Sequence, residues 1–74
     1  MITIDRIEYD DQSWTRDVST ALKKGSNVTL KNFRYDSDMN YCQEIGRQHH
    51  VKVTLHLDHT VCCFEKITAP QKKR

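Results

Sequence analysis

The chain has little glycine and proline and no long apolar run, and these shortages exclude several classes of protein. Its 74 residues include two glycines and one proline. Two glycines are too few for the glycine-rich loops with which many enzymes hold nucleotide phosphates. No window of the sequence approaches the roughly 18 apolar residues of a membrane-spanning helix. We therefore predict neither a phosphate-loop enzyme nor a protein that contacts a membrane.

Cysteine is also scarce, and its arrangement does not suit disulfide bonds. The three cysteines are Cys42, Cys62 and Cys63, an odd number that includes a vicinal pair. Free cysteines are typical of proteins in a reducing compartment. Residues 1–11 (MITIDRIEYDD) are acidic where a secretory signal peptide carries positive charge and an apolar run. These features predict a cytoplasmic protein.

The net charge is small, but the charges are unevenly distributed along the chain. The total is +2, with 36% hydrophobic and 30% charged residues. Residues 1–17 hold five carboxylates and two arginines, so this segment carries −3 and the remainder carries +5. A chain of this length has room for one domain. We predict a single domain over residues 1–67 and a basic flexible tail over residues 68–74.

Hydrophobic patterns divide the domain into six elements. Alternation of apolar and polar residues predicts strands over 2–7, 27–33, 51–58 and 61–67, with a slip in the alternation at Arg6. Apolar residues at helical spacing predict helices over 14–24 and within 34–50, the second capped by Ser37. Gly46 weakens the second helix, which indicates a close packing contact there. The expected core contains Trp14, Val18, Leu22, Val28, Leu30, Met39, Cys42, Ile45, Val53, Leu55 and Leu57.

The element order β-α-β-α-β-β predicts a single small domain of the α+β class. Right-handed crossovers place both helices on one face of a mixed four-stranded sheet and leave its other face bare. The register of the last hairpin decides whether Cys62 or Cys63 is buried, and the sequence leaves both open. The bare face should include Thr29, Lys31, Lys52, Thr54, His56 and Asp58.

This element order resembles that of the C-terminal domain of translation initiation factor three and of the small sulfur-carrier proteins. The sulfur carriers have a Cys-Pro pair at the start of the first helix, where residues 11–14 here read DQSW and the only proline is Pro70. A small nucleic-acid-binding family has an arginine followed, after three residues, by a histidine. Here Val51 stands at that distance from Arg47. The sequence therefore assigns the chain to no family and predicts no sulfur transfer.

Histidine and cysteine side chains gather near the last hairpin and raise the question of a metal. His56, His59 and Cys63 are ligand types that zinc accepts, although their spacing matches no established zinc module. Nucleophilic catalysis by Cys63 beside His56 would need a cleft that a flat sheet lacks. We expect no cofactor and no catalytic residues, and a small zinc-binding protein remains an alternative.

Two binding functions remain, and they use surfaces of opposite charge. An RNA- or DNA-binding domain would use the bare sheet face through Arg6, Lys31, Lys52 and His56. A protein-binding domain would use the acidic strip, which we define as Glu8, Asp10, Asp11 and Asp17. We favour the second reading, a non-enzymatic monomer or homodimer. It would act as an inhibitor or accessory factor of a nucleic-acid-processing enzyme, similar in size and polarity to compact phage inhibitors.

Overall fold

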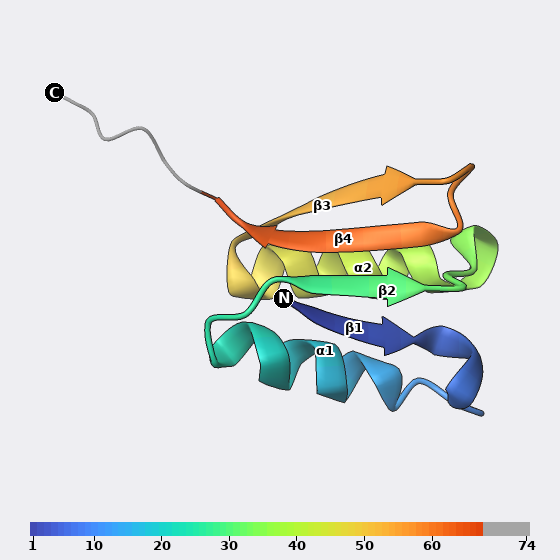
Figure 1. Ribbon diagram of the computed structural model, residues 1–74, viewed down its shortest axis with the longest axis horizontal. Helices are drawn as coiled ribbons and strands as arrows, with labels where there is room; N and C mark the ends of the chain where they lie inside the picture. Colours follow the sequence, from blue (N-terminus) through green and yellow to red (C-terminus); the bar gives the residue numbers. More distant parts are fainter. Residues whose placement is uncertain (68–74) are drawn as a thin grey trace, which may run out of the picture.

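The computed structural model describes residues 1–67 and has two layers, a sheet and a pair of helices (Figure 1). The predicted tail, residues 68–74, lies outside the described residues. In chain order the elements are β1 (Ile2–Asp5), the short 3-10 helix η1 (Arg6–Glu8), α1 (Trp14–Lys23), β2 (Val28–Lys31), α2 (Tyr35–His49), β3 (Val51–His56) and β4 (Val61–Lys66). Neither α1 nor α2 is long and apolar enough to cross a membrane.

The sheet is mixed and has the strand order β1-β2-β4-β3. β1 and β2 are parallel, whereas β4 is antiparallel to both of its neighbours. The connection from β2 through α2 therefore leads to β3 at the far edge of the sheet, and β4 lies between β2 and β3. Both helices lie on the same face of the sheet (Figure 1). The predicted α+β domain with two helices on one face is confirmed.

The core lies between the helices and the covered face of the sheet. The register places Leu30 and Leu55 on either side of Cys62, so Cys62 points toward the helices and is fully buried. Cys63 consequently points to the bare face, which settles the hairpin register that the sequence left open. The buried hydrophobic residues are Ile4, Trp14, Val18, Ala21, Leu22, Val28, Leu30, Phe33, Cys42, Ile45, Cys62 and Phe64.

One predicted core residue is wrong, because Leu57 is 74% exposed. The alternation of apolar residues continues to Leu57, but β3 ends at His56. Leu57, Asp58 and His59 then have φ angles of 51°, 55° and 66°, all in the left-handed region. The backbone N–H of Thr60 donates to the Leu57 carbonyl at 3.1 Å and closes the turn. Asp58 belongs to this turn and is therefore not part of the bare strand face.

Two further local predictions are corrected by side-chain hydrogen bonds. The slip at Arg6 is the end of β1, where Asp5 Oδ1 accepts from the N–H of Ile7 at 3.1 Å and starts η1. Ser37 does not cap α2, because the helix begins at Tyr35. Asp38 instead reaches back, and its Oδ2 accepts the backbone N–H of Arg34 at 3.1 Å.

The packing role predicted for Gly46 is confirmed. A Cβ atom at this position would lie 2.6 Å from Val53 Cγ2 and 3.3 Å from the Val51 carbonyl oxygen. Real Cβ contacts are not this short, so a larger residue would push α2 away from β3. Gly46 therefore sets the separation between this helix and the edge of the sheet.

Candidate functional site

A buried ion pair joins the start of the chain to α2. Arg6 Nε donates to Asp38 Oδ2 at 3.0 Å, and the two side chains are only 8% and 2% exposed. The Arg6 guanidinium also donates to the Tyr9 carbonyl at 2.9 Å and lies 5.6 Å from the centre of the Trp14 ring. The placement of Arg6 on a nucleic-acid surface is therefore wrong, because this side chain lies inside the protein.

This ion pair changes the charge of the surface around it. Because Asp38 neutralises Arg6 internally, Arg6 no longer offsets the carboxylates of the N-terminal segment. All four side chains of the acidic strip are exposed, and Arg16 is the remaining arginine of residues 1–17. The exposed side chains of residues 1–17 therefore carry a more negative charge than the −3 counted from the sequence.

The acidic strip occupies η1, the following loop and the first turn of α1, at the end of the molecule where β1 finishes (Figure 1). Asp11 Oδ1 accepts the N–H of Ser13 at 2.9 Å, and this bond lowers the pKa of Asp11. Among the described residues, the Glu8 and Asp10 side chains make no hydrogen bond or ion pair within the protein. These two carboxylates are therefore free to contact a partner.

Asp17 connects the acidic strip to the body of the domain. Its Oδ2 accepts a hydrogen bond from the phenol hydroxyl of Tyr9 at 2.5 Å. This hydrogen bond raises the pKa of Tyr9 to about 12, with a further contribution from partial burial of the phenol. This contact ties the segment after η1, which contains Tyr9, to α1. The acidic strip is therefore held against α1 by a side-chain contact as well as by the chain itself.

A groove lies directly beside the strip, between β1 and α1. We call it the β1–α1 groove; it has a volume of about 290 Å³. Its sides are largely apolar, and Asp17 belongs both to this groove and to the acidic strip. β1 is the first strand of the sheet order and pairs only with β2, so its outer edge is unpaired within residues 1–67. The lining residues are Ile2, Ile4, Tyr9, Asp17, Thr20, Ala21 and Lys24.

The bare sheet face carries five of its predicted residues, Thr29, Lys31, Lys52, Thr54 and His56, but its charges are balanced. The register puts Thr3, Thr29, Cys63 and Thr54 side by side in one row of small side chains. In the rows on either side of it, Lys31 stands opposite Asp5, and Lys52 stands opposite Glu65. Each lysine on this face therefore has a carboxylate directly across from it, and the face presents no positive strip.

The histidines and cysteine that were considered for a metal do not come together. His56 is on the bare face, where its Nε2 lies 3.2 Å from Thr54 Oγ1. His59 instead stacks on the ring of Tyr35, with 4.8 Å between the ring centres. Across residues 1–67, no group of three or more His, Cys, Asp or Glu side chains is arranged to hold a metal ion.

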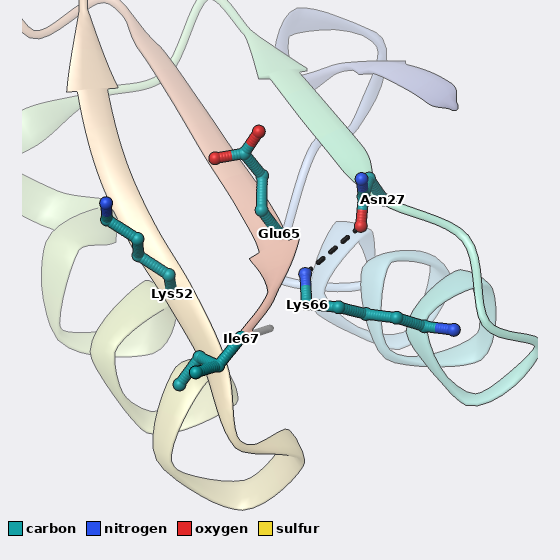
Figure 2. A pocket seen from close by; sticks show the side chains of 5 residues that line it. All are labelled: Asn27, Lys52, Glu65, Lys66 and Ile67. Atoms are coloured by element: carbon teal, nitrogen blue, oxygen red, sulfur yellow. Dashed lines mark hydrogen bonds between the residues drawn. The ribbon is translucent and has the colours of Figure 1, made fainter. Parts of the chain in front are cut away.

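A second depression lies at the other end of the sheet, where β4 finishes (Figure 2). It has a volume of about 470 Å³ and is lined by Asn27, Lys52, Glu65, Lys66 and Ile67. Asn27 Oδ1 accepts the backbone N–H of Lys66 at 3.1 Å. Figure 2 shows that the ammonium groups of Lys52 and Lys66 point in opposite directions, so they do not converge on an anion.

Several members of the candidate site were missed by the sequence reasoning. Four residues, Tyr9, Thr20, Ala21 and Lys24, line the groove because α1 lies beside the edge strand β1, and no local pattern encodes this arrangement. Comparison of the chain with protein-family models and with curated proteins, and of its structure with solved structures, found no match.

Proposed function

We propose that this protein is a non-enzymatic protein-binding domain that binds a basic partner. The observation that carries the proposal is the adjacency of the acidic strip and the β1–α1 groove, which share Asp17. Exposed carboxylates attract and orient a positively charged partner, whereas an apolar groove supplies contact area that excludes water. The two features together suit protein recognition better than either does alone.

The charge of the strip also indicates a class of partner. Enzymes that process nucleic acids carry basic surfaces, because most of their affinity comes from contacts with phosphate groups. A surface with exposed carboxylates at Glu8, Asp10 and Asp11 presents the same sign of charge as a phosphate backbone. We propose that the protein occupies such a basic surface and acts as an inhibitor or accessory factor.

Nucleic-acid binding through the bare sheet face has less support. That alternative depends on Lys31 and Lys52, yet Asp5 and Glu65 stand directly opposite them. The third cation assigned to this face, Arg6, is buried with Asp38. A phosphate backbone crossing this face would meet as many carboxylates as lysines.

Affinity capture with matched baits tests the proposal. The wild-type protein, the strip variant Glu8→Lys/Asp10→Lys and the control Glu44→Lys would each be used to capture proteins from a lysate of the source organism. Within residues 1–67 the exposed Glu8 and Asp10 side chains make no hydrogen bond or ion pair, so the strip variant should fold normally. Glu44 is an exposed residue of α2 that accepts hydrogen bonds from its helix neighbours Arg47 and Gln48.

The proposal expects a basic protein that both the wild type and the control capture and that the strip variant loses. Circular dichroism and a thermal unfolding curve of each bait establish that the fold is retained. If the strip variant captures the same proteins in the same amounts as the wild type, the acidic strip is not the binding surface. Capture of nucleic acid alone by all three baits would favour the bare face.

A further inference from the structure

The outer edge of β1 exposes backbone groups that are ready to pair. In a parallel ladder, the N–H and C=O of one residue point to the same side, and successive residues alternate. The N–H of Ile2 donates to the Asn27 carbonyl at 2.9 Å, so the backbone N–H and C=O groups of Ile2 and Ile4 point toward β2. The backbone N–H groups of Thr3 and Asp5 therefore point away from the sheet, along its free edge.

The β1–α1 groove lies under this same edge. Ile4 belongs to β1 and Ala21 to α1, and both line the groove from the helix-covered side of the sheet. A strand placed beside β1 would lie about 4.8 Å from it. Alternate side chains of such a strand would point to the covered side and enter the groove, and the others would lie beside Thr3.

We infer that the bound segment of the partner is an extended basic peptide that adds to β1 as a fifth strand of the sheet. This inference rests on the proposed function, since it specifies how the same surface engages its partner. Apolar side chains of the peptide fill the groove against Ile4 and Ala21. Its basic side chains meet the carboxylates of Glu8, Asp10 and Asp17 at the end of the groove.

Charge favours a basic partner over a second copy of this chain at the edge. A second copy of this chain has a net charge of only +2 and exposes the same carboxylates, so it offers the strip little opposite charge. A basic peptide meets the opposite sign of charge along the whole strip. Backbone pairing at a sheet edge supplies affinity, and the alternate side-chain pockets supply specificity.

The test uses a synthetic heptapeptide, acetyl-Lys-Val-Lys-Val-Lys-Val-Lys-amide, and the ¹⁵N-labelled full chain. At saturating peptide, the amide hydrogen exchange of Thr3 and Asp5 should slow at least tenfold, while the amides of β3, the other edge strand, remain unchanged. The variant Thr20→Tyr, which fills the groove from an exposed position of α1, should weaken binding at least fivefold. The control Gln43→Tyr, an exposed position of α2, should bind normally.

Two N-methylated peptides make the test specific for strand pairing. One is methylated on the backbone nitrogens of its lysines and the other on those of its valines. Successive N–H groups of a strand point to opposite edges, so only one of the two sets can face β1. Strand addition predicts that one peptide loses binding and the other retains it. Equal behaviour of both peptides would overturn the inference.

The outcomes separate this inference from the proposed function. Binding that depends on Glu8 and Asp10 but leaves exchange at Thr3 and Asp5 unchanged overturns strand addition and leaves the acidic surface standing. Binding that the strip variant Glu8→Lys/Asp10→Lys does not weaken contradicts the proposed function itself. If the peptide fails to bind at millimolar concentration, strand addition is overturned, and the capture experiment alone decides the function.

Discussion

The guanidinium of Arg6 and the carboxylate of Asp38, 32 residues apart, form an ion pair inside the protein at 3.0 Å. Removal of one partner leaves the other as an uncompensated buried charge. We expect Asp38→Ala to lower the free energy of unfolding by about 3–5 kcal/mol. Urea denaturation of the variant measures this loss.

A double variant distinguishes the ion pair from simple packing. Because replacing both charges with apolar side chains removes the cost of burying them, Arg6→Met/Asp38→Leu should be more stable than Asp38→Ala. A loss below about 1 kcal/mol for Asp38→Ala would contradict this account, since that is the range of an exposed ion pair.

The Arg6–Asp38 pair also illustrates what the sequence could not predict. The sequence predicts Ser37 as the cap of this helix, whereas the Asp38 carboxylate accepts the backbone N–H of Arg34. Nothing in the local pattern indicates that Arg6 turns inward to meet it, because the contact exists only once η1 lies against α2. The β1–α1 groove was missed for the same reason.

The elements themselves were predictable, because each strand and helix has a clear hydrophobic period. The strand ends were less so, and Leu57 shows why. Its place in the alternating pattern predicts burial, but three consecutive residues with positive φ end the strand before it. The acidic strip was predicted from the distribution of charge along the chain, whereas the groove residues that lie beside it in space were not predicted.

The variant Gly46→Ala should destabilise the protein even though alanine favours helices. The new Cβ would lie 2.6 Å from Val53 Cγ2 and would force α2 away from β3. Overpacking of this kind costs about 1–3 kcal/mol, more than the roughly 1 kcal/mol that alanine adds to helix stability. Thermal unfolding measures the difference.

The companion variant Gly46→Ala/Val53→Ala checks the cause. Val53→Ala removes the methyl group that the new Cβ would meet, so the double variant should lose less stability than the sum of the two single variants. Strict additivity would show that the Gly46 contact with Val53 is not what destabilises Gly46→Ala.

Tyr9 should titrate with a pKa of about 12, because its phenol hydroxyl donates a hydrogen bond to the Asp17 carboxylate. The phenolate absorbance of the wild type minus that of Tyr9→Phe isolates this titration. A pKa that is higher in the folded protein than the ordinary 10.0 means that the fold favours the protonated phenol. The stabilisation is complete below pH 10 and is lost as the pH rises toward 12.

The variant Asp17→Asn provides the control for this titration. Without the carboxylate, the pKa of Tyr9 should fall toward its ordinary value, and the decline in stability between pH 10 and 12 should become smaller. A Tyr9 titration that is unchanged in Asp17→Asn would contradict the contact that joins the acidic strip to η1 and α1.

The three cysteines should differ sharply in reactivity. Cys42 and Cys62 are fully buried, whereas Cys63 is half-buried on the bare face. The Cys62 thiol beside it and its burial raise the pKa of Cys42, which keeps this thiol protonated and unreactive. A thiol reagent should therefore modify one cysteine in the native protein and three after denaturation.

The variant Cys63→Ser assigns the reactive thiol. It should abolish the modification of the native protein at near-neutral pH and leave two cysteines that react after denaturation. Rapid modification of Cys62 in the native state would contradict the hairpin register that places Cys63, and not Cys62, opposite Thr29 and Thr54.

The central claim is that the acidic strip binds a basic partner, and the affinity for a purified captured partner tests it most directly. Isothermal titration calorimetry would compare the wild type with Glu8→Lys/Asp10→Lys and Glu44→Lys at low and at physiological salt. The account predicts that the strip variant binds at least tenfold more weakly at low salt, that the control binds normally, and that added salt narrows the difference. Equal affinities of all three proteins at low salt would contradict it.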